Sequence, residues 1–325
     1  MRFIQEEILG MNWLNRLIGS ELKAVGLDGG AIQFFLYDSL KIMALLCVTV
    51  LLVSYAQSYF PPERSKRILG RFRGVTANCV AAALGAITPF CSCSSIPLFI
   101  GFTGAGLPLG MTFSFLIASP MINPASLLLL MGIFGWKVAA AYVALGLAIA
   151  VLGGGLIGSL HMESQVEDFI LNAPKSNALP RTPTFQERVK YSWEQAVATA
   201  ASVFPYVLLG VGIGAAIHNW IPQDFVAAAL GGENPLGVPI AVAVGVPMYA
   251  DIFGVIPVAE ALLSKGAFLG VVLSFMMAVT ALSLPSMVML RKAIKPKLLG
   301  AFIAVCTAGI ILVGYFFNAM QGALI

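Results

Sequence analysis

"TPFCSCSSIP", from Thr88 to Pro97, lies within a stretch from Gly74 to Leu130 that carries no charged side chain. Two cysteines separated by one serine, followed by two more serines and bracketed by prolines, are unusual in so apolar a stretch. A proline inside a helix removes one backbone N–H donor and leaves a carbonyl without its partner. The sequence therefore predicts a helix interruption that carries thiols and hydroxyls.

The composition around this stretch is typical of a membrane protein. The chain has 325 residues, of which 59% are hydrophobic and 10% are charged, with a mean hydropathy of +0.91. Soluble globular chains have about 25% charged residues, and about 20 consecutive apolar residues are enough to cross a bilayer. We therefore predict an all-α polytopic membrane protein. Its long apolar segments are 31–60, 74–106, 107–131, 136–160, 190–218, 237–265, 266–290 and 298–320.

The chain divides into two halves with related sequences. A polar, proline-containing linker at 161–189 separates a first transmembrane repeat, 31–160, from a second, 190–325, and residues 1–30 form an amphipathic N-terminal segment. Residues 96–130 align with 256–290 without a gap, at an offset of 160 residues, and we call this register the repeat alignment. The matching pairs are Pro97 and Pro257, Gly106 and Gly266, Ser114 and Ser274, and Ser126 and Ser286. Such repeats are common in secondary transporters, whose substrate sites lie near the midplane where helices are interrupted.

Segment length predicts a re-entrant hairpin in each half. In 237–265 the arms on either side of "MYADIFG" are too short to cross, because a crossing needs about 20 residues. By the repeat, 74–106 folds the same way, with Thr88–Pro97 at its tip. Three crossings and one hairpin in each half give two inverted repeats. The alternative is eight full transmembrane helices in two parallel repeats.

The charges of the loops favour the inverted arrangement. Lys and Arg concentrate in the cytoplasmic loops of membrane proteins. The inverted arrangement places loops 61–73, 161–190 and 291–297 in the cytoplasm, with 5, 4 and 4 Lys/Arg, and leaves 5 outside. The parallel arrangement divides these residues 10 to 8. The linker and the 291–297 loop are therefore expected on the same side of the membrane.

Cys91 and Cys93 are the first candidate substrate-binding residues. On a regular helix their side chains would point about 200° apart, whereas an unwound tip lets both face one cavity. Thiolates bind soft partners such as Cu(I) and Zn, and trivalent arsenic belongs chemically with these. The alternative is that both cysteines are small buried hydrophobes. The hydroxyls at the same tip are also candidates: Ser92, Ser94 and Ser95.

The second hairpin carries two carboxylates, one of them at its tip. The repeat places Asp251, with Tyr249 beside it, opposite the cysteine pair, and Glu260 lies on the returning arm. An intramembrane carboxylate costs about 2.5–3.5 kcal/mol on insertion scales and marks a functional site by default. Asp251 and Tyr249 are therefore candidate substrate contacts, and Asp251 and Glu260 are candidate coupling residues. Their alternative roles are a hydrogen bond to hairpin amides for Asp251 and a solvated, interfacial position for Glu260.

Asn123 is the candidate from a second interruption, "SPMINP", which follows the first hairpin. Its amide either contacts the substrate or forms a hydrogen bond between helices. "SLPS", from Ser283 to Ser286, interrupts the corresponding segment of the second half.

These motifs resemble the ArsP-type predicted permeases. The resemblance rests on "TPFCSCSSIPLF", on "SPMINP", and on "GVPMYAD" followed by an Ile-Pro pair, and it spans nearly the whole chain. Characterised members of that family are bacterial inner-membrane proteins that export trivalent organoarsenicals. The resemblance implies a multi-pass permease of the inner membrane. It also implies Cys91, Cys93, Asn123 and Asp251 as pathway residues.

Three functions are compatible with the sequence. The first is a secondary permease, driven by an ion gradient, that exports a small thiophilic solute such as a trivalent organoarsenical. The second is a metal-ion or sulfur-compound permease, and the third is a membrane thiol oxidoreductase that uses Cys91 and Cys93. The sequence contains no Walker A motif, and a disulfide between residues two apart is strained, so a permease is favoured over an enzyme. The expected partners are a small molecule or ion and the lipid bilayer, with no nucleic acid and no cofactor, and the oligomeric state and any metal stay open.

Overall fold

The computed structural model describes residues 30–57, 72, 74–88, 92–122, 127, 130–132, 135–167, 170, 184–220, 236–248, 255, 259, 262–263 and 266–324. Within these ranges the chain is helical, apart from turns and one isolated β-bridge. The prediction of an all-α polytopic chain is therefore confirmed. The elements are α2 (Gly30–Gln57), α4 (Val75–Ile87), α5 (Ser92–Gly104), α6 (Leu109–Met121), α8 (Trp136–Ser159), η2 (Glu163–Gln165), α10 (Phe185–Trp220), α12 (Gly237–Gly245), α14 (Leu269–Ala281), α15 (Leu284–Arg291) and α16 (Pro296–Leu324).

Two short helices, α6 and α14, form the centre of the fold. Every residue of α6 is buried, and α14 is buried at every position except Thr280. Both are apolar all round, which is typical of helices that are surrounded by other helices. α6 packs against α4, α5 and α8, while α14 packs against α12 and α16. The two central helices also contact each other and join both halves in one apolar core.

The same local structures recur at matching positions of the two halves, as the repeat alignment predicts. α6 and α14 have the same length and matching ends, and α8 and α16 begin at matching positions. A Schellman turn precedes each central helix. In it Gly106 or Gly266 has a positive φ of 79° or 85° and donates its amide at 2.9 Å to a carbonyl three residues earlier. This left-handed conformation favours glycine because a Cβ would be strained there.

Small residues let each central helix touch its neighbour at matching positions. A Cβ on Gly154 of α8 would meet the hydroxyl of Ser114 on α6. In the second half, a Cβ on Gly314 of α16 would meet the hydroxyl of Ser274 on α14. Glycine is therefore needed at both places for the two backbones to approach.

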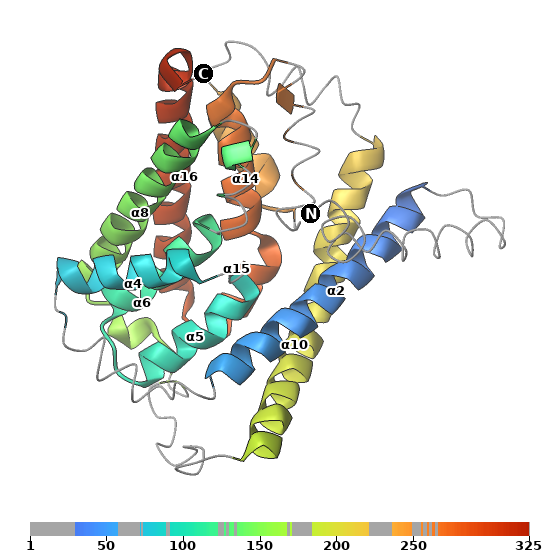
Figure 1. The fold of residues 1–325 in the computed structure, drawn as a ribbon, viewed down its shortest axis with the longest axis vertical. Helices are drawn as coiled ribbons and strands as arrows, with labels where there is room; N and C mark the ends of the chain where they lie inside the picture. Colours follow the sequence, from blue (N-terminus) through green and yellow to red (C-terminus); the bar gives the residue numbers. More distant parts are fainter. Residues whose placement is uncertain are drawn as a thin grey trace.

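α8 and α16, which correspond in the repeat, pack side by side and antiparallel (Figure 1). A Cβ on Gly153 would meet Val305, and a Cβ on Gly309 would meet Ile149. The residue of α8 that lies nearer its start, Ile149, thus contacts the residue of α16 that lies nearer its end, Gly309. The two helices therefore run in opposite directions. Ile149 and Gly309 are themselves 160 residues apart, the offset of the repeat alignment, so corresponding positions meet across this interface.

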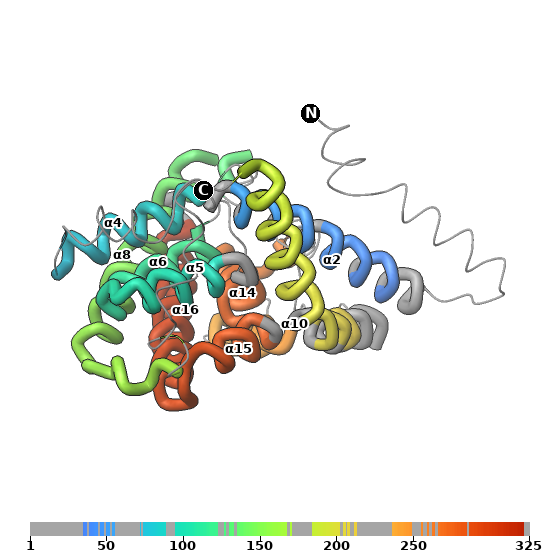
Figure 2. The backbone as a smooth tube through the Cα atoms, turned by 90° about the horizontal axis from the view of Figure 1, so that it is seen from below, coloured from blue at the N-terminus to red at the C-terminus, as the bar shows by residue number. Residues whose placement is uncertain are grey.

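α2 and α10 form a second pair at one side of the molecule, which is visible in both views (Figures 1 and 2). The rings of Tyr55 and Phe185 lie 6.2 Å apart at one end of the pair. Phe35 lies beside Gly212 near the other end, so these helices are also antiparallel. They share an apolar cluster of Ile42, Leu46, Val50, Ala196, Val207 and Val211.

The apolar helices fall into two groups by length: helices long enough to cross a membrane and helices too short to cross it. Within the described ranges, three helices are long and apolar enough to cross a membrane: Phe35–Leu52 of α2, Trp136–Ser159, and Pro296–Gln321 of α16. α4, α5, α6 and α14 have 13 residues each, a rise of about 20 Å against a hydrocarbon core of about 30 Å. The short helices α4 and α5 thus end at Ile87 and begin at Ser92, before and within the predicted tip at Thr88–Pro97. Their re-entrant path and the inverted orientation of the halves stay predictions.

A contact between backbones joins the start of the linker to the loop before α16. Val166 and Ile294 form an antiparallel β-bridge, and hydrogen bonds of 3.1 and 2.7 Å between backbone groups flank it. Both side chains are buried in the apolar core. We call residues 164–167 and 291–295 the linker clasp.

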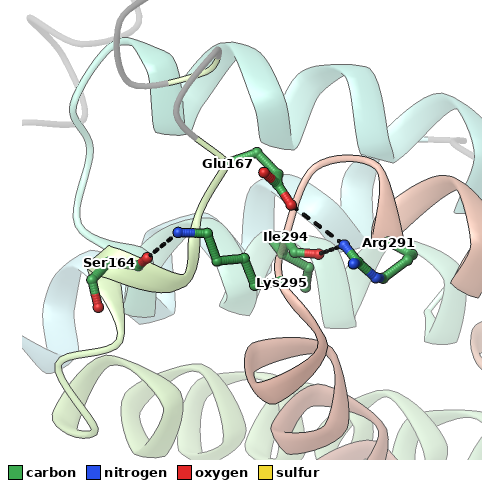
Figure 3. Close-up of polar contacts among 5 residues, drawn as sticks. All are labelled: Ser164, Glu167, Arg291, Ile294 and Lys295. Carbon is green, nitrogen blue, oxygen red and sulfur yellow. Dashed lines mark hydrogen bonds and ion pairs between the residues drawn. The ribbon is translucent and has the colours of Figure 1, made fainter.

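Charged side chains add polar contacts across the linker clasp (Figure 3). The Arg291 guanidinium donates to the Glu167 carboxylate at 3.3 Å and to the Ile294 carbonyl at 3.2 Å. The Lys295 ammonium donates to the Ser164 carbonyl at 2.9 Å. The linker and the 291–297 loop therefore meet at one end of the helices, which agrees with their expected placement on the same side.

Candidate functional site

Three helix ends converge beside the cysteine-serine stretch. α4 ends at Ile87, α5 begins at Ser92, and α6 ends at Met121. A Cβ on Gly85 would meet the Phe115 carbonyl at 2.8 Å and the Ser119 amide at 3.2 Å, so the end of α4 lies directly on the end of α6. This close approach places the chain just before the tip against the chain just before Asn123.

A hydrogen bond between two serines links α5 to α6 at this point. The hydroxyls of Ser95 and Ser119 lie 2.7 Å apart, and both residues are fully buried. Ser95 is one of the candidates from the sequence, whereas Ser119 was not singled out. Ser119 lies in "SPMINP", so the motif contained the signal, but its partner lies in a different motif and could not be read from spacing.

The break around the cysteines is shorter than the sequence suggests. We expected Pro97 to interrupt a helix, but α5 runs through it from Ser92 to Gly104. The helix is held by packing on α6, where the rings of Phe99 and Phe113 lie 5.0 Å apart. Pro97 still lacks the N–H that would bond the Cys93 carbonyl, so one polar group is freed in the first turn.

The predicted hydroxyl and thiol groups are placed by the backbone of α5. Ser92, Cys93 and Ser94 form the first turn of the helix, just before Ser95. The positions of their side chains, and the whole of Cys91, lie outside the described residues. Asn123 also lies outside them and directly follows Ile122, whose amide closes α6 with a 2.8 Å bond to the Ala118 carbonyl.

Tyr142 holds the end of α6 from the other side. Its hydroxyl donates to the carbonyl of Met121 at 2.7 Å, and the residue is buried. The bond satisfies a carbonyl at the last residue of α6, where helical partners run out. Sequence analysis missed Tyr142, because one tyrosine in an apolar segment carries no local signal. The available signal was that Phe302, at the matching position of the second half, has the same ring without the hydroxyl.

The second half ends its central helix differently. α14 stops at Ala281, and the "SLPS" interruption separates it from α15, as predicted. The hydroxyl of Ser283, which precedes α15, lies 2.8 Å from the hydroxyl of Ser286 in the first turn of α15. Tyr249, Asp251 and Glu260 lie outside the described residues.

The described part of the site is polar but uncharged. No group of three or more His, Cys, Asp and Glu side chains that could hold a metal ion occurs among the described residues. The cysteines described elsewhere are free: Cys47 is partly buried, Cys79 is exposed and Cys306 is buried. The convergence of helix ends thus offers hydroxyls and a freed carbonyl between α4, α5 and α6.

These features define a multi-pass, all-helical membrane protein with polar groups at interrupted helices. The chain belongs to the ArsP-type predicted permease family, whose model matches residues 29–319. It is therefore a membrane permease for a small molecule or ion, not an enzyme.

Relatives from distant organisms support the same assignment. The chain is 27% identical to the UPF0718 protein YraQ of Escherichia coli over 297 residues, which are 87% of this chain and 80% of the relative. It is 23% identical to a UPF0718 protein of Methanocaldococcus jannaschii over 272 residues, 66% of this chain and 74% of the relative. A putative two-component membrane permease complex subunit of Streptococcus mutans is 20% identical over 302 residues, 89% of this chain and 95% of that protein. No solved structure matches the chain.

Proposed function

We propose that this permease is a secondary transporter of the inner membrane that exports a small thiophilic solute, with trivalent organoarsenicals as the first substrate class. The substrate meets Cys91 and Cys93 beside Ser92, Ser94, Ser95 and Asn123 at the first tip. Tyr249 and Asp251 complete the site from the second tip. Asp251, with Glu260 behind it, couples transport to an ion gradient.

The observation that carries this proposal is the convergence of α4, α5 and α6. Gly85 brings the end of α4 onto α6, and the Ser95–Ser119 bond brings the start of α5 to the same place. Cys91 and Asn123 each lie within a few residues of these contacts along the chain. Two soft thiols and an amide near buried hydroxyls suit a neutral, thiophilic solute better than a strongly hydrated ion.

The packing of corresponding helices supports two inverted repeats around this site. α8 runs antiparallel to α16, and α2 runs antiparallel to α10. α8 and α16 begin at positions 160 residues apart, as in the repeat alignment, and α2 and α10 are the first described helices of their halves. Antiparallel packing of corresponding helices is expected when two halves are related by a two-fold axis in the membrane plane. The short helices α4 and α5 support a hairpin whose tip lies inside the bilayer.

A serine replacement of both tip cysteines tests the substrate class. In Cys91→Ser/Cys93→Ser the side chains keep their approximate size but lose their soft-ligand character. Everted membrane vesicles should then accumulate methylarsenite at least about tenfold more slowly, which corresponds to a loss of about 1.4 kcal/mol. The matched control is Cys47→Ser/Cys79→Ser, which changes two other free cysteines and should leave uptake unchanged.

Other outcomes of the vesicle assay would favour the alternatives. Transport of a metal ion or a sulfur anion, with no response to methylarsenite, would replace the arsenical by that substrate. A Cys91–Cys93 disulfide that forms and breaks in step with a redox reaction would favour the thiol oxidoreductase. Wild-type methylarsenite transport by the tip variant would remove the thiols from the site.

A further inference from the structure

The end of α6 is tied to two neighbouring helices by hydroxyl groups. Ser119 bonds to Ser95 on α5 at 2.7 Å, and Tyr142 on α8 donates to the Met121 carbonyl at 2.7 Å. All three hydroxyl-bearing residues are buried. These bonds fix the last turn of α6 relative to the first turn of α5.

The second half has buried apolar residues at the equivalent positions. At the same offset of 160 residues, extended on both sides of the repeat alignment, Ser95, Ser119 and Tyr142 correspond to Val255, Val279 and Phe302. These three apolar residues are 1–2% exposed, so they are buried like their counterparts. Val255 and Val279 belong to one apolar cluster, and α14 ends where α6 ends. The hydroxyls are therefore not required to pack or to end the central helix.

Stability gives no reason for the hydroxyl pair of Ser95 and Ser119. Replacing both partners of a buried hydrogen bond by apolar groups of similar shape is nearly neutral or stabilising. A hydrogen bond, however, is directional and fixes one geometry, whereas an apolar contact tolerates small shifts. The first half thus has a directional restraint at the place where the second half has an apolar contact.

The restrained turns are those that continue into the candidate thiols and amide. Ser95 lies two residues after Cys93 and four after Cys91, and Met121 lies two residues before Asn123. We infer that Ser95, Ser119 and Tyr142 are positioning residues, which fix the first turn of α5, where Cys93 lies in the sequence, relative to the last turn of α6, which precedes Asn123. This inference rests on the proposed function, because it assigns these groups to one substrate site.

Substitutions that keep the shape of the side chain distinguish the effect of the hydroxyl group from the effect of side-chain packing. Valine and threonine have the same shape, so Ser119→Val and Ser119→Thr differ only in a methyl or a hydroxyl group. The valine at position 279 shows that a β-branched side chain fits the equivalent place. Tyr142→Phe likewise removes one hydroxyl and creates the pattern of the second half.

A matched control comes from the other end of the same helix. Thr112 on α6 is buried, and its hydroxyl donates to the Leu109 carbonyl within the helix at 3.0 Å. Its counterpart in the repeat alignment is the buried Val272. Thr112→Val is thus the same kind of exchange, made away from the cysteines.

Two measurements test the inference on the full chain. The first is the rate of maleimide labelling at Cys91 and Cys93, resolved by peptide mass spectrometry. The second is the KM and the maximal rate of methylarsenite transport in everted vesicles. Ser119→Val and Tyr142→Phe should change labelling severalfold and raise the KM about tenfold, the factor expected for one lost hydrogen bond. Ser119→Thr and Thr112→Val should retain wild-type values in both assays.

The two readouts separate this inference from the proposed function. If Ser119→Val labels like Ser119→Thr and like the wild type, the positioning role is overturned, whatever the substrate is. If labelling changes but no variant, including Cys91→Ser/Cys93→Ser, affects methylarsenite transport, the positioning role holds and the arsenical proposal falls.

Discussion

Val166 and Ile294 form a bridge between the end of the first half and a loop of the second half. The flanking hydrogen bonds run from the Glu167 amide to the Ala293 carbonyl and from the Lys295 amide to the Gln165 carbonyl. This pattern is that of a non-hydrogen-bonded antiparallel pair, whose Cα atoms lie about 4.5 Å apart. The clasp therefore joins α8 and α16 into one body at this end of the molecule.

The first prediction is that the linker clasp stays closed during transport. A disulfide requires Cα atoms about 4.4–6.8 Å apart, so Val166→Cys/Ile294→Cys should crosslink under mild oxidation. Transport should continue in the crosslinked protein because both sides of the clasp move together. Peptide mass spectrometry measures the crosslink and vesicle transport measures the activity. Crosslinking that stops transport, with recovery on reduction, would show that the clasp opens.

The second prediction concerns the contact between α8 and α6. In Gly154→Ala the new methyl group meets Ser114 and the α6 backbone, so we expect a loss of about 1–3 kcal/mol from overpacking. Gly300→Ala on α16 meets nothing within 4 Å and should be neutral or stabilising by up to about 1 kcal/mol. Thermal unfolding in detergent compares the two. Equal unfolding midpoints would contradict the close contact.

The third prediction is a pH-dependent start of α10. Thr184 donates its hydroxyl and its amide to the Glu187 carboxylate at 2.6 and 2.8 Å; the amide bond is the one that the glutamate makes in a capping box. The hydroxyl bond first, and then the amide bond, lower the pKa of Glu187 below its ordinary value of 4.5. Its stabilising contribution is therefore complete above that value and is lost as the pH falls through the lowered pKa.

Hydrogen exchange in the first turn of α10 measures this effect. Protection of these amides should fall as the pH is lowered below the ordinary Glu187 pKa of 4.5 in the wild type, while Glu187→Gln should show weak protection that does not depend on pH. Glu194→Gln, on the same helix with only a 4.0 Å pair to Lys190, should behave like the wild type. A pH response retained in Glu187→Gln would assign the effect to another group.

The fourth prediction concerns Asp251 as the coupling carboxylate. Asp251→Asn keeps the shape and hydrogen bonding of the side chain but fixes it neutral. The variant should bind substrate, yet fail to accumulate it against a gradient and lose the pH dependence of transport. Vesicle uptake with and without an imposed proton gradient measures both. Uphill transport with the wild-type pH profile would transfer the coupling role to Glu260.

The sequence predicted those parts of the fold that depend on local chemistry. The break at Ser283–Ser286 was predicted from its proline and serines, and the predicted segment boundaries at Gly106 and Gly266 coincide with glycine turns in the structure. The course of α5 through Pro97 was predicted wrongly, because packing of Phe99 on Phe113 outweighs one missing hydrogen bond.

The candidate site was predicted only in its local part. The Cys-Ser-Cys stretch is visible in one short segment, whereas the bond from Tyr142 to Met121 joins residues 21 positions apart through a backbone carbonyl. Every residue has a backbone carbonyl, so the sequence does not show which carbonyl accepts a given hydrogen bond. The three-dimensional arrangement of the helices is needed to identify it. The same is true of the pairing of α2 with α10 and of the linker clasp.

The pairing of α2 with α10 also has a consequence for the synthesis of the chain. More than a hundred residues separate the end of α2 from the start of α10, and ribosomes add about 5–20 residues per second. The apolar face formed by Ile42, Leu46 and Val50 therefore spends roughly 10–30 s in the nascent chain before Val207 and Val211 exist to cover it. During that interval lipid is the solvent of this face. A nascent chain arrested before residue 185 should accordingly crosslink from Leu46 to lipid, and a finished chain should not.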